Sequence, residues 1–166
     1  MLPGHAPGAA ATPRPARSVG VRHHRLVPAA PPAQSTEVCP GCGAVLVAPE
    51  SQAPTRPGAS ASCVRLFEVT LRGLREEAGT DASCAAVMRR ADAAYDAQHP
   101  TPADPERLHA ALESLGADLG GPVPAQWTTT IADVAADLDV IDLATLVDAW
   151  ARAVREDWAA VGAPRP

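Results

Sequence analysis

Apolar residues recur every three or four positions along most of the chain after residue 60, which is the spacing of one face of an α-helix. The first such stripe follows two serines, Ser60 and Ser62, either of which can cap a helix, and Gly79 ends it. The apolar positions of this first predicted helix are Cys63, Val64, Phe67, Leu71 and Leu74.

Two further helices are predicted in the middle of the chain. Thr80 or Asp81 can accept the free amide hydrogens in the first turn of one, and Pro100 ends it. The other begins at Pro105, a residue suited to a first turn, and runs to the glycines at 120–121. Their apolar positions are Cys84, Val87, Met88, Ala91 and Tyr95 in the first, and Leu108, Leu112, Leu115 and Leu119 in the second.

The C-terminal part predicts a short helix followed by a long one. Thr130 and Asp133 have the spacing of a capping box, which opens the short helix, and that helix extends to Leu138. The long helix has two tryptophans on one face, which we expect to pack into the core of the same chain. Its apolar stripe is Leu143, Leu146, Val147, Trp150, Val154 and Trp158.

The chain before residue 60 has a different pattern. The apolar run Gly43–Ala48 predicts one strand, and residues 49–60 have the composition of a loop. Residues 1–36 are rich in Pro, Ala and Gly and almost free of large apolar side chains, so we expect this tail to be disordered. The predicted fold is mainly α: a single small domain of about five helices over residues 37–162.

Charge is distributed unevenly along the chain, whose net charge is −5. All four charged residues before Glu37 are arginines, whereas the remainder is acidic. The acidic remainder argues against nucleic acid as the main partner. The tail is read as a solubilising segment, with nucleic-acid binding through its arginines as a less favoured alternative. No run approaches the ~20 apolar residues of a membrane span, and the N-terminus lacks the apolar stretch of a secretory signal. We therefore expect a cytoplasmic protein whose four cysteines are reduced, which favours metal or redox roles over disulfides.

The segment Cys39-Pro40-Gly41-Cys42-Gly43 carries the strongest chemical signal. Two thiolates three positions apart can hold one metal ion when the backbone between them turns tightly, and the glycine after the second cysteine allows amide hydrogens to approach the sulfurs. This pattern predicts a zinc knuckle at the N-terminal edge of the domain. A closed Zn²⁺ site needs four ligands, so the other two must come from elsewhere in the chain.

Four residues compete for the two remaining positions. Cys63 is the first choice, because it lies at the start of a predicted helix, where the helix dipole favours a thiolate. His99, between a helix and Pro100, is the second choice. Cys84 and His109 remain alternatives, although Cys84 falls on an apolar helix face, where a lone cysteine is usually a small buried hydrophobe.

A redox pair is the rival interpretation of Cys39 and Cys42. Thiol oxidoreductases place such a pair on the first turn of a helix, where the thiol pKa falls. Here a proline and two glycines surround the pair and the following run is extended, which disfavours that interpretation. No nucleophile–base arrangement and no phosphate-binding loop stands out elsewhere.

Five short motifs follow one another along residues 37–160. They are Cys39–Gly43, Cys63 with Phe67, Tyr95 with Gln98-His99-Pro100, Thr130–Val134, and Trp150 with Trp158. Their order resembles that of a bacterial family, domain of unknown function 5946, which is common in actinobacteria. The family carries no established activity, so the resemblance implies the domain without naming a reaction. Members usually have a further histidine near the position of Met88 and more near the C-terminus, which this chain lacks.

These observations favour a zinc-stabilised binding or interaction protein whose metal site is structural and is formed by Cys39, Cys42, Cys63 and His99. The alternative is a metal-dependent enzyme of hydrolytic type, with an open metal position near His99 and His109. A thiol redox protein acting through Cys39 and Cys42 is the further alternative. The sequence leaves open which protein partner it has and its oligomeric state.

Overall fold

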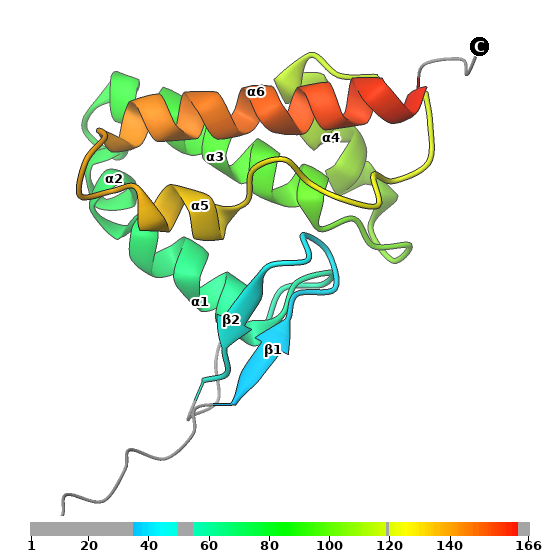
Figure 1. Ribbon diagram of the computed structural model, residues 1–166. Coiled ribbons are helices and arrows are strands. Elements are labelled where there is room, and N and C mark those ends of the chain that lie inside the picture. Colours follow the sequence, from blue (N-terminus) through cyan, green and yellow to red (C-terminus); the bar gives the residue numbers. More distant parts are fainter. Residues whose placement is uncertain (1–34, 50–54, 119, 163–166) are drawn as a thin grey trace, which may run out of the picture. The chain divides into compact units, whose positions relative to one another are not determined.

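The computed structural model describes residues 35–49, 55–118 and 120–162, which form six helices and one two-stranded sheet (Figure 1). The prediction of a mainly α fold is confirmed. The tail predicted to be disordered lies outside the described residues, apart from Ser35 and Thr36. The elements are β1 (Thr36–Val38), β2 (Val45–Val47), α1 (Ala61–Thr70), α2 (Arg72–Glu77), α3 (Ala82–Gln98), α4 (Pro105–Leu115), α5 (Ile131–Ala136) and α6 (Leu143–Gly162).

A small β-hairpin precedes the helices. β1 and β2 pair antiparallel, with Val38 opposite Val45, and the amide of Cys39 donates to the carbonyl of Ala44 over 2.9 Å to close the turn. The apolar run Gly43–Ala48 predicted β2, whereas β1 was not predicted. Three residues are too few to display an alternating pattern, and β1 exists because its backbone pairs with β2.

Two helix boundaries differ from the predictions. The first predicted helix is two helices, because the backbone leaves the helical region at Leu71, and Gly73 weakens the helix beyond it. The third predicted helix ends at Leu115 rather than at the glycines 120–121. Gly116 adopts a left-handed conformation there, and the amide of Ala117 donates to the carbonyl of Leu112, as in a Schellman cap. Leu119, predicted to continue the stripe, lies outside the described residues.

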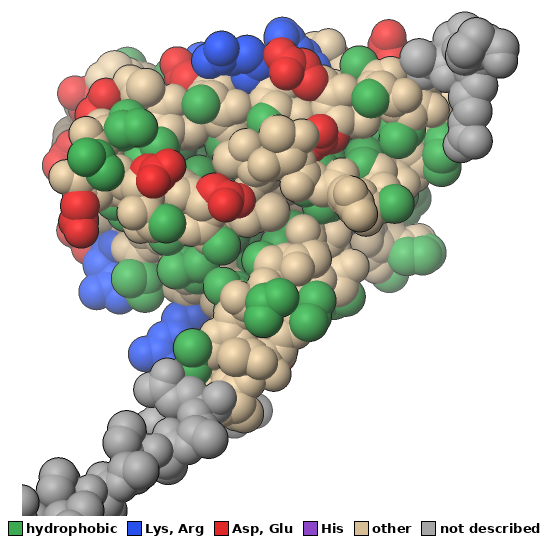
Figure 2. Space-filling view, viewed as in Figure 1, with side chains coloured by type: hydrophobic (Ala, Val, Ile, Leu, Met, Phe, Trp, Pro, Cys, Tyr) green, Lys and Arg blue, Asp and Glu red, His purple; other side chains and the backbone are tan. Residues whose placement is uncertain are grey.

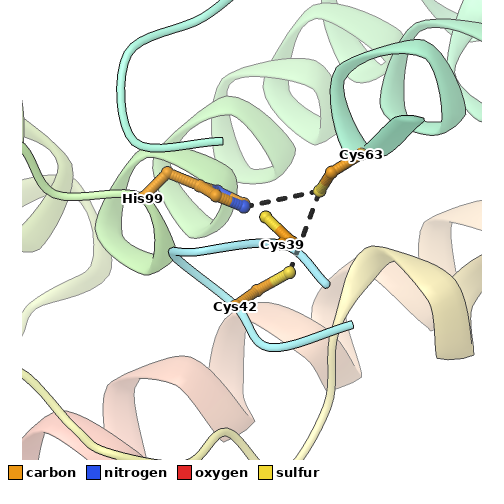
Figure 3. Close-up of side chains that lie close together, drawn as sticks. All are labelled: Cys39, Cys42, Cys63 and His99. Carbon is orange, nitrogen blue, oxygen red and sulfur yellow. Dashed lines mark hydrogen bonds between the residues drawn. The ribbon is translucent and has the colours of Figure 1, made fainter. Parts of the chain in front are cut away.

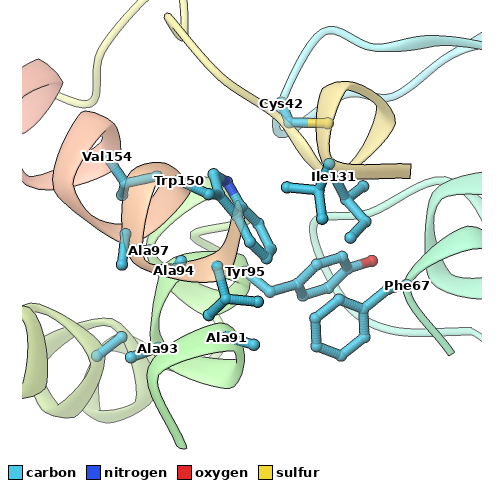
Figure 4. Close-up of a cluster of buried hydrophobic side chains, with 14 of the residues drawn as sticks. Cys42, Phe67, Ala91, Ala93, Ala94, Tyr95, Ala97, Ile131, Trp150 and Val154 are labelled. Atoms are coloured by element: carbon cyan, nitrogen blue, oxygen red, sulfur yellow. The ribbon is translucent and has the colours of Figure 1, made fainter. Parts of the chain in front are cut away.

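The core lies between α3 and α6. α3 packs against both α4 and α6, and α5 lies between α1 and α6. Small side chains on α3 allow the indole of Trp150 to approach closely (Figure 4). Trp150 and Trp158 are both buried, so the tryptophan stripe is intramolecular core, as expected. The fully buried alanines that form the α3 surface are Ala91, Ala94 and Ala97.

Cys84 does not lie in the core. It occupies the first turn of α3, it is only half-buried, and its thiol lies 3.5 Å from a carboxylate oxygen of Glu77. The expectation of a buried apolar cysteine was therefore wrong, because the apolar face of α3 is buried only from Met88 onward. None of the described helices is both long and apolar enough to cross a membrane.

Candidate metal centre

The turn between β1 and β2 positions the first two cysteines. The amide of Gly43 donates to the carbonyl of Cys39 over 2.9 Å, which tightens the turn. Gly43 has φ +75°, a conformation that glycine adopts without steric penalty. As a result both thiols point to the same side of the turn, toward the helices (Figure 3).

The side chain of Cys63 extends toward the thiols of Cys39 and Cys42 from the first turn of α1 (Figure 3). Ser60 caps the helix, since its hydroxyl accepts the amide hydrogen of Cys63 over 3.3 Å. The amide of Ser60 itself donates to the sulfur of Cys39 over 3.4 Å. One capping residue therefore orients two of the cysteines.

His99 reaches the same point from the C-terminal end of α3. Its Nδ1 lies 2.6 Å from the carbonyl oxygen of Tyr95, so Nδ1 carries the hydrogen and donates it. Nε2 is then the ring nitrogen left to bind a metal, and it faces the sulfur of Cys63 at 3.4 Å. Such a bond to the far nitrogen is the usual way in which a metal-binding imidazole is oriented.

The four ligand atoms form a compact group. Three sulfurs and the imidazole nitrogen all lie within 4.8 Å of one another, and the sulfurs of Cys42 and Cys63 are 3.8 Å apart (Figure 3). Tetrahedral zinc with Zn–S of about 2.3 Å and Zn–N of about 2.0 Å implies edges of about 3.8 Å between sulfurs and about 3.5 Å between sulfur and nitrogen. The two observed edges match these values, so this group could hold a metal ion.

Solvent does not reach the group. The exposed fractions are 1% for Cys39, 5% for Cys42, 0% for Cys63 and 1% for His99. A tyrosine covers one side, because the ring of Tyr95 stacks on that of His99 with centroids 4.1 Å apart, and its hydroxyl lies 3.7 Å from the sulfur of Cys63. Burial at this level is typical of closed structural sites rather than of sites that bind substrate.

The cluster holds its protons unevenly. Hydrogen bonds from the thiols of Cys42 and Cys63 hold the pKa of Cys39 far below its usual range. Acting as a donor to Cys39 raises the pKa of Cys63 well above its usual range. Burial lowers the pKa of His99, but hydrogen bonds to Cys39 and Cys42 outweigh burial and raise it to about 9. A bound dication would replace the protons on the thiols of Cys42 and Cys63 and on Nε2 of His99.

The structure brings together all four of the residues predicted as ligands and leaves out both alternatives. Cys84 lies in the first turn of α3, at the opposite end of that helix from His99. His109 is exposed on α4 and does not belong to the group.

Two supporting residues were missed by the sequence reasoning. The indole of Trp127 donates to the carbonyl of Gly41 over 3.0 Å, which fixes the knuckle to the segment before α5. The guanidinium of Arg107 donates to the carbonyls of Pro57 and His99 over 3.1 and 3.0 Å. Neither residue carries a pattern that would identify it, because each acts on backbone carbonyls distant in sequence.

The two glycines of the knuckle make a matched pair for mutation. A Cβ at Gly41 would lie 2.5 Å from Cδ2 of His99 and 2.7 Å from the carbonyl oxygen of Gln98, whereas a Cβ at Gly43 meets nothing within 4 Å. We expect Gly41→Ala to displace His99 and lower metal affinity by at least about tenfold, which corresponds to ~1.4 kcal/mol. Gly43→Ala strains only its backbone, so the loss is smaller. Competition for zinc against a chromophoric chelator measures both, and equal losses would contradict the steric argument.

Comparison with known proteins gives one match. A model of a protein family, described as a family of unknown function (DUF5946), matches residues 37–126, a segment that contains all four ligand candidates. No curated protein and no solved structure matches the chain.

Proposed function

The chain belongs to the DUF5946 family of unknown function, and we propose that it is a zinc-stabilised helical interaction protein with a structural metal site. The ligands in this proposal are Cys39, Cys42, Cys63 and His99. The observation that carries it is the convergence of these four buried ligand atoms within 4.8 Å of one another. The proposed domain is residues 37–162.

The donor set supports zinc as the metal. Three thiols and one imidazole suit a tetrahedral ion of intermediate softness, whereas Ca²⁺ and Mg²⁺ prefer oxygen ligands. When bound, zinc would supply cross-linking and charge neutralisation rather than reactivity. The nitrogen contributed by His99 is already oriented by Tyr95, and the thiol of Cys63 is held at a capped helix start.

A structural role is supported by the completeness of the site. Catalytic zinc sites keep three protein ligands and one position for water or substrate, whereas this cluster offers four ligands and is closed to solvent. The enzyme alternative required a position open near His99 and His109. Because His99 is buried and His109 is exposed on another helix, that alternative has no support among the described residues.

The redox alternative is also less well supported. Cys39 and Cys42 lie in a hairpin turn rather than on the first turn of a helix, and both are buried. Exchange with a partner disulfide requires an accessible thiolate. All four cysteines are unpaired thiols, which agrees with the cytoplasmic location we propose.

The proposed ion would join three segments that are distant from one another in the sequence. A hairpin with strands of three residues is not stable alone in water. The cluster ties this hairpin to the start of α1 and to the end of α3, through residues 21 and 36 positions apart. Metal binding would therefore contribute to the free energy of folding of the domain.

Metal removal tests the structural role. We expect the purified chain to contain one zinc ion, and Co²⁺ in its place to give thiolate charge-transfer absorption with tetrahedral d–d bands. Chelation should lower the free energy of unfolding by at least several kcal/mol, because structural zinc sites supply folding energy outright. Thermal melts followed by circular dichroism, with and without chelator, measure this. An unchanged melting temperature after complete metal removal would refute the structural role.

The interaction role is supported by an apolar surface on the hairpin. Val38, Val45 and Val47 share one face of the sheet and are 63%, 65% and 55% exposed; we call them the valine face. Figure 2 shows apolar side chains gathered on the hairpin. Interaction surfaces commonly present contiguous exposed apolar side chains, so the valine face supports the proposed interaction role.

A paired substitution tests the valine face. Threonine keeps the β-branched shape and strand propensity but adds a hydroxyl, so Val38→Thr with Val45→Thr should leave the fold intact and weaken partner binding. Crosslinking in cells, followed by identification of the crosslinked proteins, should show partners lost from this variant. The matched control is Val140→Thr, because Val140 is exposed on the turn before α6. The same partners in the paired variant and in the wild-type chain would contradict the role.

A further inference from the structure

A hollow formed by α3, α4 and α6 has a positively charged lining. It lies between the C-terminal end of α4 and the outer face of α6, with α3 beside it, and has a volume of about 300 Å³. Three arginines line it, Arg90 from α3 and Arg152 and Arg155 from α6, together with Ser114 from α4. Such a concentration of positive charge stands out in a chain whose net charge is −5.

The charges in the hollow are not balanced. Asp148 is the one acidic residue in its lining, and it forms an ion pair with Arg90. Among the described residues, Arg152 and Arg155 form no ion pair. They lie three positions apart on α6, and so on the same face of the helix. Arginine side chains gather over α6 at the upper edge of Figure 2.

We propose that this hollow, which we call the arginine hollow, is a binding site for a small phosphate monoester. Two guanidinium groups on one helix face can each present parallel N–H donors to phosphate oxygens, a geometry that favours oxyanions over chloride. The hydroxyl of Ser114 lies in the same lining and adds a donor. Leu115 and Ala151 provide an apolar wall for the organic part of the ester.

The size of the hollow sets the class of ligand. A volume of about 300 Å³ is at the lower end of small-molecule sites, so it suits one phosphate group with a compact organic substituent. The site is separate from the proposed zinc cluster, since no residue of Cys39, Cys42, Cys63 and His99 lines it. Its ligand therefore does not depend on the role of the metal.

Titration of the zinc-loaded full chain tests the proposal. Inorganic phosphate and phenyl phosphate are added separately at a constant ionic strength of about 0.15 M, and backbone amide shifts are followed by NMR. We expect saturable shifts at Ser114, Ala151 and Arg152, with phenyl phosphate binding more tightly because its ring contacts the apolar wall. The proposal would be overturned if neither probe gave saturable shifts. It would also be overturned if chloride displaced phenyl phosphate as effectively as inorganic phosphate does.

Two variants and a control separate a specific site from general charge attraction. Arg152→Ala with Arg155→Ala should weaken phenyl phosphate binding by about tenfold or more, since both are exposed and their loss leaves the core intact. Asp148→Asn should strengthen binding several-fold, because it removes the one negative charge and frees Arg90. Arg72→Ala, on α2 and outside the hollow, should change nothing. Unchanged affinity in the double variant, weaker binding in Asp148→Asn, or an equal loss in Arg72→Ala would each overturn the proposal.

Discussion

Replacing Cys63 with serine is expected to abolish stoichiometric zinc binding and to unfold most of the chain at physiological temperature. Cys63 is fully buried. Its sulfur lies 3.8 Å from the sulfur of Cys42 and 3.4 Å from Nε2 of His99. A hydroxyl is shorter, harder and rarely deprotonated, so it does not replace a thiolate on zinc. Structural zinc contributes about 10–16 kcal/mol of apparent binding free energy in small domains, and a whole domain is stable by only about 5–15 kcal/mol.

Cys84→Ser is the matched control for that substitution. Cys84 is half-buried, lies outside the cluster and contacts Glu77, so its replacement should change stability by no more than about 0.5 kcal/mol. Zinc content by elemental analysis and the melting temperature by circular dichroism should be compared for both variants. If both retained one zinc per chain and melted like the wild-type chain, Cys63 would not be a ligand.

Trp150→Ala is expected to produce the second-largest loss. The indole is fully buried between α3 and α6, and its Nε1 donates to the side-chain carbonyl of Gln98 over 3.0 Å. Truncating such a side chain to alanine costs about 3–5 kcal/mol through lost burial and the cavity left behind. The carbonyl of Gln98 would also lose its donor inside the core, which adds about 1–3 kcal/mol. Urea denaturation of the zinc-loaded chain measures the total.

Phenylalanine substitutions separate the two contributions at Trp150. Trp150→Phe keeps an aromatic ring and removes the donor to Gln98. Trp158→Phe makes the same chemical change at a buried indole whose Nε1 has no partner among the described residues. We therefore expect Trp150→Phe to be more destabilising by about 1–3 kcal/mol. Equal losses would mean that the hydrogen bond to Gln98 contributes nothing measurable.

The choice of ligands could be predicted because each one occupies a position with a local signature. Cys39 and Cys42 flank a turn rich in glycine, and Cys63 follows a capping serine, which marks a helix start. His99 directly follows the last turn of α3 and precedes Pro100. Such signatures can be recognised in a single sequence because they depend only on residues that are neighbours along the chain. They say nothing about whether the three segments meet, which only the packing of α1 on the hairpin and α3 decides.

The features that sequence reasoning missed depend on long-range partners. β1 has no pattern of its own and forms by pairing with β2. Trp127 and Arg107 act on the carbonyls of Gly41 and His99, and a carbonyl gives no sequence signal. Of the α3 alanines, Ala91 alone was predicted to lie on the apolar face, although Ala94 and Ala97 prove to be fully buried as well.

The order in which the ligands appear along the chain has a consequence for biosynthesis. All four precede residue 100, so the proposed metal ion would find its complete ligand set while α4, α5 and α6 are still unmade. The two closures, of 21 and 36 residues, carry modest entropy costs because that cost grows only with the logarithm of loop length. Gln98, adjacent to His99, would then already be oriented when Trp150 leaves the ribosome. A metal bound at this stage would link the hairpin, α1 and α3 before the later helices are made.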